Sequence, residues 1–322
     1  MTPGAIRTED LTKHFGRTVA LDGLTLEVGD GEIFGFLGPN AAGKSTTIRL
    51  LLGIIRPTRG RAWLGDIPVS DVVRAHRSVG YVPGDVALWP QLTGQETLDL
   101  LGGMAGVVDA SYRDGLVERF DLDSSRRVRA YSKGNRQKIA LVAAFMTRPR
   151  ILLLDEPTAG LDPLMEAEFQ ALSREVAAEG CTAFLSSHLL DEVEDLCHRV
   201  AILRDGHLVE VASLAELRQL TTTIFEAELA RPAPSFTDLA EVVAVEPMDG
   251  GVRVTVNGEP AEVIARLSAA GVRRLHSRAP SLEQIFLTYY DTRASQRRAV
   301  ATAHGDMGPR DAVGDEHRWP TP

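Results

Sequence analysis

Short apolar runs alternate with helical patterns through the first two-thirds of the chain. Such alternation predicts an α/β fold in which helices pack on a sheet. The expected strands are residues 24–28, 33–37, 78–82, 151–154, 182–185 and 200–203. Between about residues 93 and 132 the pattern changes to helices with no obvious strand, which indicates a helical insertion.

A smaller second unit is expected to begin near residue 222. Its expected strands are residues 223–229 and 252–256, and its expected helices are residues 259–269 and 281–289. Its expected elements are interrupted by the Pro-containing run 231–235 and by the turn Asp249, Gly250, Gly251.

These patterns divide the chain into a larger α/β domain over residues 1–220, with a helical subdomain at about 91–147, and a smaller α+β domain over residues 221–290. A tail over residues 291–322 is charged and contains one aromatic residue, so we expect it to be disordered.

Composition narrows the class of protein further. The net charge is −9, so the chain lacks the excess of positive charge that is typical of nucleic-acid-binding proteins. Cys181 and Cys197 lack metal-ligand spacing and suit a reducing compartment. The longest apolar run, residues 139–146, is far too short to span a membrane, and the first residues contain no apolar signal core. We therefore expect a soluble, cytoplasmic protein.

A phosphate-binding loop follows the apolar run 33–37. It reads Gly38, Pro39, Asn40, Ala41, Ala42, Gly43, Lys44, Ser45, Thr46. In this pattern backbone N–H groups surround phosphates, the lysine reaches the outer phosphates and the hydroxyl holds Mg²⁺. A helix expected at residues 43–52 adds the positive end of its dipole. Lys44 is one of four lysines beside 31 arginines, and a compact ammonium suits phosphate oxygens.

Two carboxylates follow the apolar run 151–154. Open α/β sheets place their chemistry at the carboxyl ends of strands, where Asp155 and Glu156 are expected. Asp155 would hold Mg²⁺, and Glu156 would orient and polarise an attacking water. The alternative is a pair of solvated carboxylates at a strand end.

Two further positions have both a structural and a functional interpretation. Ser132 and the free N–H groups near Gly134 open a helix that runs to about Met146, so they form either a helix cap or a second anion site. His188 follows the strand expected at residues 182–185. It is either an ordinary surface or core histidine or a hydrogen-bond partner of a γ-phosphate.

Taken in order, these motifs resemble those of the ATP-binding subunits of ABC transporters. Residues 38–46 resemble Walker A, residues 131–137 the signature, residues 151–156 Walker B, residues 159–162 the D-loop, and His188 the switch histidine. The resemblance implies a P-loop NTPase of the ABC type, with a helical insertion and a small C-terminal α+β accessory domain.

The resemblance covers about residues 6–220 and also implies roles for individual residues. Lys44, Glu156 and His188 would be catalytic, while Ser45 and Asp155 would bind Mg²⁺. Phe15 lies where the family stacks an aromatic ring on adenine, although it could equally be a small-core residue.

The mechanism implied by the resemblance is a head-to-tail homodimer that sandwiches two ATP molecules. Each site would combine the Walker motifs of one chain with Ser132 and Gly134 of the other. Closure would drive transport through a separate integral-membrane permease, which places the chain at the inner face of the cell membrane. The opening Tyr131, Ser132, Lys133, Gly134 and the C-terminal unit resemble subunits of drug and lipid exporters.

The sequence departs from the family pattern at several positions. Ala41 stands where glycine is common, and Lys133 and Asn135 stand where glycine and glutamine are commonest. The glutamine expected after Val82 is replaced by Gly84. Asp85 either takes over its role or is an ordinary turn aspartate that follows Pro83 and Gly84.

Other classes of protein contain the same type of nucleotide-binding domain. Ribosome-associated ABC ATPases usually carry two modules, whereas this chain has one phosphate loop. DNA-repair ATPases place a very long coiled coil between Walker A and the signature, but only 88 positions separate Lys44 from Ser132. A regulatory protein that binds ATP without turnover is disfavoured by Glu156. The sequence therefore favours an export ATPase that uses ATP and Mg²⁺ and binds no nucleic acid.

Overall fold

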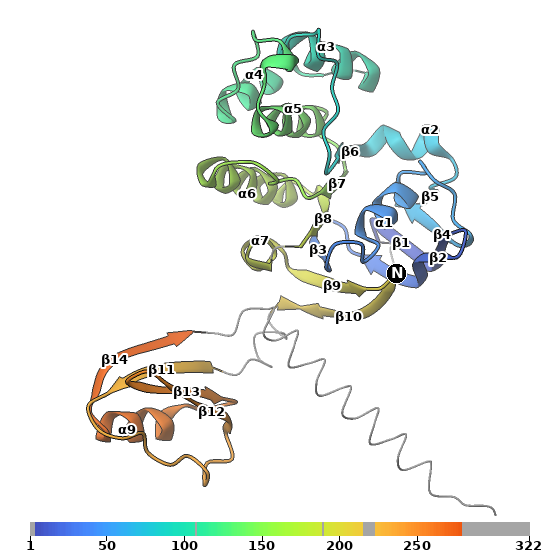
Figure 1. Ribbon diagram of the computed structural model, residues 1–322. Helices are drawn as coiled ribbons and strands as arrows, with labels where there is room; N and C mark the ends of the chain where they lie inside the picture. Colours follow the sequence, from blue (N-terminus) through green and yellow to red (C-terminus); the bar gives the residue numbers. More distant parts are fainter. Residues whose placement is uncertain (1–3, 107, 189, 215–222, 279–322) are drawn as a thin grey trace, which may run out of the picture. The chain divides into compact units, whose positions relative to one another are not determined.

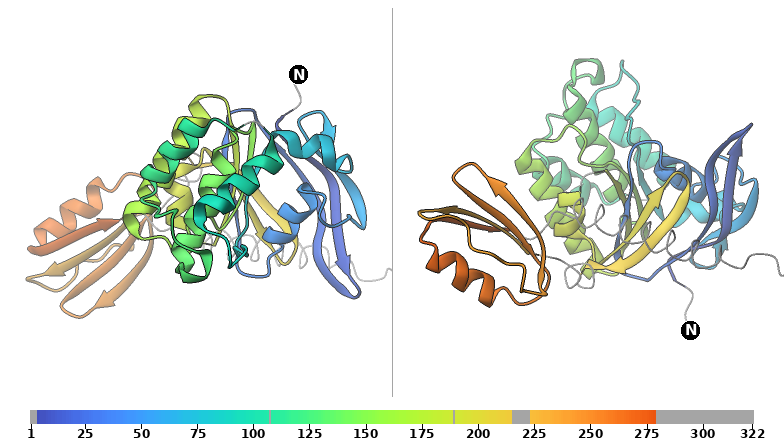
Figure 2. Two further views of the ribbon diagram at one scale, coloured as in Figure 1. Left: turned by 90° about the horizontal axis from the view of Figure 1, so that it is seen from above. Right: turned by 60° about the horizontal axis from the view of Figure 1, so that its bottom comes forward.

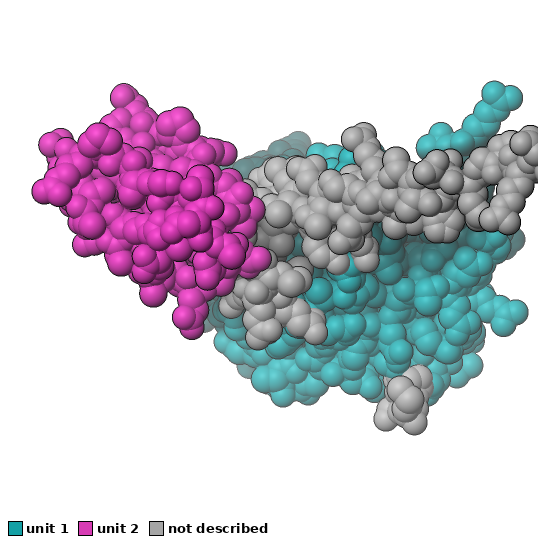
Figure 3. Space-filling model, turned by 90° about the horizontal axis from the view of Figure 1, so that it is seen from below, with its two compact units in different colours: residues 1–219 teal, residues 220–322 magenta. Residues whose placement is uncertain are grey.

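The structure is a computed structural model that describes residues 4–106, 108–188, 190–214 and 223–278. The chain divides into two compact units, Met1–Gln219 and Leu220–Pro322, which are coloured separately in Figure 3. The first unit contains two sheets and the second contains one, and each unit has its own apolar core.

A six-stranded sheet forms the centre of the first unit, in the order β10-β9-β3-β8-β7-β6 (Figure 1). Its strands are β3 (Ile33–Leu37), β6 (Val79–Val82), β7 (Ile151–Asp155), β8 (Thr182–Ser187), β9 (Arg199–Arg204) and β10 (His207–Ser213). All neighbours are parallel except β10, which pairs antiparallel with β9. Every residue of β3, β7 and β8 is buried, as expected for parallel strands covered on both faces.

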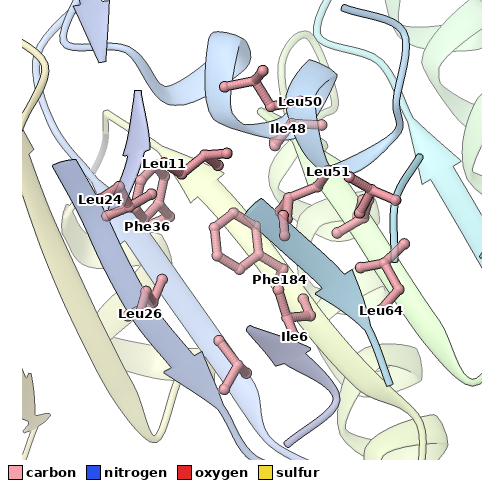
Figure 4. Packing of buried hydrophobic residues seen from close by; sticks show 14 of the residues in the cluster. Ile6, Leu11, Leu24, Leu26, Phe36, Ile48, Leu50, Leu51, Leu64 and Phe184 are labelled. Carbon is pink, nitrogen blue, oxygen red and sulfur yellow. The ribbon is translucent and has the colours of Figure 1, made fainter. Parts of the chain in front are cut away.

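An antiparallel sheet lies beside it in the order β2-β1-β4-β5. Its strands are β1 (Ile6–Phe15), β2 (Thr18–Val28), β4 (Arg59–Leu64) and β5 (Ile67–Pro68). Side chains from both sheets and from helix α1 (Lys44–Leu51) meet in one apolar core (Figure 4). Within it the Phe184 ring lies 5.9 Å from that of Phe34 and 5.0 Å from that of Phe36, measured between centroids. Burial of each such ring contributes about 1.5–3 kcal/mol.

The helical part of the first unit contains α3 (Gly94–Ala105), α4 (Ala110–Arg119), the short 3₁₀ turn Val128–Ala130 and α5 (Lys133–Phe145). A capping box starts α3, where Thr93 and Glu96 satisfy each other's backbone N–H groups. Arg119 of α4 is bound to Glu168 and Glu175 of α6 (Pro163–Ala178). These ion pairs attach the helical part to the sheet-covering helix α6.

Among the described residues of the first unit, the remaining helices are short. They are α2 (Val72–Ala75), which runs into a 3₁₀ turn at His76–Ser78, and α7 (Leu190–Leu196). In the described part of the chain, no helix combines the length and the apolar character that crossing a membrane requires.

Over residues 223–278 the second unit is a four-stranded antiparallel sheet in the order β12-β13-β11-β14, with one helix along one face (Figure 2). Its elements are β11 (Thr223–Leu229), β12 (Val242–Met248), β13 (Gly251–Val256), α9 (Ala261–Ala269) and β14 (Val272–Arg278). Phe225, Val254 and Leu267 lie in its apolar core.

The structure confirms each expected strand, in most cases within longer bounds, and the helices expected at residues 43–52 and 259–269. The strand expected at residues 78–82 begins one residue later, because Ser78 ends a 3₁₀ turn. Strands β1, β4, β5, β10, β12 and β14 were not expected. In β1 the pattern is irregular because register shifts interrupt its pairing with β2, so its apolar residues do not alternate cleanly. The helix expected at residues 281–289 and the tail lie outside the described residues.

Candidate ATP-binding site

The phosphate loop connects the end of β3 to the start of α1. Glycine is required at both ends of this loop by close backbone packing. A Cβ atom on Gly38 would lie 2.3 Å from the carbonyl oxygen of Leu203. Gly43 has a left-handed φ of 109°, and a Cβ there would lie 2.4 Å from the carbonyl oxygen of Ala20. The motif glycines therefore seat the loop against β2 and β9, which fixes where its N–H groups point.

Lys44 is buried inside the loop, with a relative exposure of 5%. Its Nζ donates to the carbonyl oxygens of Gly38 at 2.6 Å and Pro39 at 3.2 Å, and it lies 3.9 Å from Oε1 of Glu156. Burial lowers the pKa of Lys44, while Glu156 and then Asp155 oppose that shift. An anion bound in the loop would add a further negative charge beside this ammonium and so favour its charged form.

Asp155, also 5% exposed, ends β7 and accepts two hydrogen bonds from hydroxyl groups. Its Oδ1 lies 2.6 Å from Oγ of Ser186 and 3.2 Å from Oγ of Ser45. Ser45 of α1 and Asp155 of β7 are thus brought together from positions 110 residues apart. Ser186 is part of the site although it had no expected role, because only the pairing of β7 with β8 places it opposite Asp155.

Glu156 and His188 lie beyond adjacent strands and contact each other. The distance from Nδ1 of His188 to Oε1 of Glu156 is 3.1 Å. Glu156 holds a left-handed φ of 48°, a conformation that is unfavourable for a residue with a side chain. Lys44, Ser45, Asp155, Glu156 and His188 therefore converge through bonds that the structure records.

Ser132 and Gly134 lie at the N-terminus of α5. Ser132 is exposed, and its Oγ accepts a hydrogen bond from the backbone N–H of Asn135 at 3.2 Å, which makes it the helix cap. A Cβ on Gly134 would lie 2.4 Å from the carbonyl oxygen of Gly160. Within the described chain neither residue has a recorded contact with Lys44 or Glu156, so one chain alone does not bring them to the phosphate loop.

Phe15 ends β1 and is 51% exposed, so it is not the small-core residue that one interpretation of the sequence allowed. The Nζ of Lys13 lies 4.9 Å from the centroid of its ring. An exposed ring of this kind is available for stacking, and the stacking partner remains a prediction.

Gly84 is adjacent to the carboxylate of Asp155. A Cβ on Gly84 would lie 3.5 Å from Oδ2 of Asp155, an ordinary contact distance. Asp85 is exposed, and among the described residues no bond joins it to Asp155 or Ser45. The geometry thus gives the proposed metal-linked role of Asp85 no support beyond its position in the chain.

The architecture and the loop together define a P-loop NTPase of the ABC type. Residues 21–159 match the family model described as ABC transporter. The chain is 35% identical over 312 residues to the daunorubicin resistance ATP-binding protein DrrA3 of Streptomyces coeruleorubidus, covering 89% of this chain and 96% of the relative. It is 33% identical over 296 residues to the Nod factor export ATP-binding protein I of Paraburkholderia xenovorans, covering 89% of this chain and 97% of the relative.

A solved structure supports the same family. The ATP-binding subunit of an ABC transporter aligns with a TM-score of 0.63 and 31% identity, covering 67% of this chain and 92% of that one. The chain therefore belongs to the ABC transporter family, as an ATP-binding subunit with ATPase activity.

Proposed function

We propose that the chain powers the export of a small molecule through a separate membrane permease. The observation that carries this proposal is the extent of the similarity to export and resistance proteins. The similarity covers 96–97% of these two relatives and 89% of this chain. The first unit ends at Gln219 and is shorter than the aligned part, so the similarity extends into the second unit. The second unit is thus shared with proteins whose names state export or drug resistance.

The proposed cofactor is Mg²⁺, held by Ser45 and Asp155. Mg²⁺ prefers hard oxygen ligands, often one or two protein groups together with waters and substrate phosphates. The hydroxyl of Ser45 and the carboxylate of Asp155, 3.2 Å apart, fit that requirement. When bound, the ion would neutralise charge on the phosphates.

The proposed roles of the other residues follow from their positions. Lys44 binds the outer phosphates, because its ammonium already lies inside the loop. Glu156 orients and polarises the attacking water. His188 contacts Glu156 and would fix that carboxylate or bond the γ-phosphate. Phosphoryl transfer depends mainly on such positioning and charge stabilisation.

A head-to-tail homodimer would complete each site. Ser132 is exposed at the N-terminus of a 13-residue helix, where free N–H groups and the helix dipole favour an anion. This anion site has no recorded contact with the phosphate loop of its own chain. The γ-phosphate that it binds would therefore belong to ATP held by the phosphate loop of the second copy. The permease would hold the pair at the inner face of the cell membrane.

Complementation tests the proposed export function. Cells that lack the gene are loaded with daunorubicin as a probe, and its efflux is followed after the wild-type chain or Lys44→Ala is restored. We expect restored efflux only with the wild-type chain. Equal efflux with both chains would contradict ATP-driven export of this probe. Co-sedimentation of the wild-type chain with ribosomes, together with no efflux phenotype for a panel of chemically distinct drugs, would favour the soluble alternative.

A further inference from the structure

One carboxylate joins the two loops that carry Glu156 and His188. Glu192 lies in α7 and is half-buried. One of its oxygens accepts a hydrogen bond from Oγ1 of Thr158, and the other accepts one from Oγ of Ser187 at 2.7 Å. Both hydroxyl-bearing residues are buried, at 5% and 1% exposure.

The two residues that Glu192 holds are close neighbours of the proposed catalytic residues. Thr158 follows Glu156 by two positions, and Ser187 directly precedes His188. The two loops leave the sheet from β7 and β8, which pair in parallel. The last backbone hydrogen bond between the two segments runs from the N–H of Glu156 to the carbonyl oxygen of Ser186. The bridge through Glu192 is a further link between the two loops beyond that bond.

Glu156 and His188 need such support because neither is held by burial. Their side chains are 30% and 43% exposed, and the backbone of Glu156 is in a left-handed conformation. A displacement of about 1 Å at a catalytic group can reduce a rate about 100-fold. A group that fixes the spacing of the two loops therefore has a direct effect on turnover.

We propose that Glu192 is a positioning residue for ATP hydrolysis, acting through Thr158 and Ser187 to fix Glu156 relative to His188. The proposal rests on the catalytic roles proposed above for those two residues. The Glu192 side chain offers an acceptor oxygen to each of the two hydroxyl donors. A carboxamide offers one oxygen acceptor and N–H donors, so one hydroxyl would have to turn from donor to acceptor and the bridge would be rearranged.

A purely stabilising role fits the surroundings of Glu192 less well. The pKa of Glu166 is raised by burial and then by the negative charges of Glu192 and Asp162. Glu192 therefore repels a neighbouring carboxylate. Glu192→Gln removes that repulsion as well as one acceptor, so the loss in global stability is expected to be small while turnover falls.

The test compares Glu192→Gln with Asp195→Asn, which removes a charge from an exposed side chain of the same helix. For Glu192→Gln we expect kcat to fall by about 10- to 100-fold, with KM and the affinity for a non-hydrolysable ATP analogue within about twofold of wild type. We expect Asp195→Asn to retain wild-type kcat. Urea unfolding of both variants should resemble that of the wild-type chain.

Two further sets of variants keep the test decisive if Glu192→Gln folds poorly. Thr158→Val should lower kcat as Glu192→Gln does, and Thr158→Ser should recover it to within about threefold, because the hydroxyl returns. In a Glu156→Gln background, Glu192→Gln should change the residual single-turnover rate less than about twofold, since coupled residues are not additive.

Wild-type kcat for Glu192→Gln, or a full additional loss in the Glu156→Gln background, would overturn the positioning role while the proposed function stands. A wild-type chain without ATPase activity would instead overturn the proposed function.

Discussion

Ala41 holds a left-handed backbone conformation, with a φ of 66°, inside the phosphate loop. For a residue with a Cβ this conformation costs about 1–2 kcal/mol. Glycine adopts it freely but loses about 0.4–1 kcal/mol more through the flexibility of the unfolded chain. The balance at this position therefore favours glycine.

We expect Ala41→Gly to raise the free energy of unfolding by about 0.5–1 kcal/mol. The matched control is Ala42→Gly, since Ala42 is buried, its φ is not positive and its Cβ is packed. Urea denaturation of both variants measures the difference. A loss of stability in Ala41→Gly as large as that in Ala42→Gly would show that the loop is not strained at Ala41.

Lys44→Ala should lower ATP turnover at least about 100-fold while leaving the fold intact, because it removes the buried cation that we propose binds the phosphates. The pKa of Lys44 is lowered in the folded chain, mainly by burial. Folding therefore carries a penalty below the folded pKa, which disappears as pH rises towards the ordinary value of 10.5.

The stability of Lys44→Ala relative to wild type should accordingly be greatest near neutral pH and decline as pH rises towards 10.5. Circular dichroism, ATPase assays and urea unfolding at several pH values check this expectation. Unchanged turnover would contradict the assignment of Lys44.

The sequence motifs were sufficient to predict that Lys44, Asp155 and Glu156 share a site. The phosphate loop and the two carboxylates each follow a strand, and the carboxyl ends of parallel strands lie at the same edge of the sheet. It was not sufficient to predict Ser186 or Glu192. Ser186 reaches Asp155 only through the register of β7 against β8, and Glu192 reaches Thr158 across 34 positions of sequence. Such contacts depend on packing that no local pattern encodes.

At the scale of elements, the start of α5 combines a capping role with a proposed anion site. Ser132→Ala should cost about 1 kcal/mol of stability, because the N–H of Asn135 loses its acceptor. Ser132→Asp keeps the cap, yet places a negative charge where a γ-phosphate is expected. We therefore expect Ser132→Asp to fold with wild-type stability and lose most ATPase activity. Wild-type turnover in Ser132→Asp would reduce Ser132 to a cap.

In the second unit, α9 is tied to the connection between β11 and β12. Arg266 donates to both carboxylate oxygens of Asp238, at 2.5 and 2.6 Å, and to the carbonyl of Ser235. The Arg266 guanidinium holds the pKa of Asp238 at about 2, below the ordinary 3.8. The ion pair thus stabilises the fold above pH 3.8, and its contribution is lost as pH falls from 3.8 to about 2.

Asp238→Asn should therefore speed amide hydrogen exchange in residues 235–239 at pH 7, relative to wild type. The difference between the two proteins should shrink at pH 3, where part of the wild-type contribution is already lost. Asp249→Asn, in an exposed turn, serves as the control. Equal exchange in wild type and Asp238→Asn at pH 7 would show that the ion pair does not hold this connection.

Strands with continuous apolar sequence, such as β3 and β7, were predictable because both faces of the parallel sheet are covered. Strand β14 was not, since its sequence VRRLHSR places arginine and histidine on a partly exposed edge strand. The order of strands in each sheet follows from tertiary packing and was not read from the sequence.

At the scale of the first unit, α5 docks on the segment that follows Glu156. Gln137 is buried and donates through Nε2 to the carbonyl oxygen of Pro157 at 2.9 Å. Gly134 approaches the carbonyl of Gly160 so closely that no side chain fits between them. The helix that offers the proposed anion site is therefore in direct contact with the loop that carries Glu156, which links dimer closure to hydrolysis in the proposed mechanism.

The most direct measurement of that mechanism is size-exclusion chromatography of Glu156→Gln with ATP and Mg²⁺, combined with an assay of phosphate release. The substitution keeps the shape of Glu156 but removes the charge that is proposed to polarise the attacking water. We expect ATP to bind and persist, the protein to elute as a dimer, and phosphate release to fall at least about 100-fold. Phosphate release at the wild-type rate would contradict the catalytic role of Glu156, and a persistently monomeric ATP-bound protein would contradict the ATP-driven dimer.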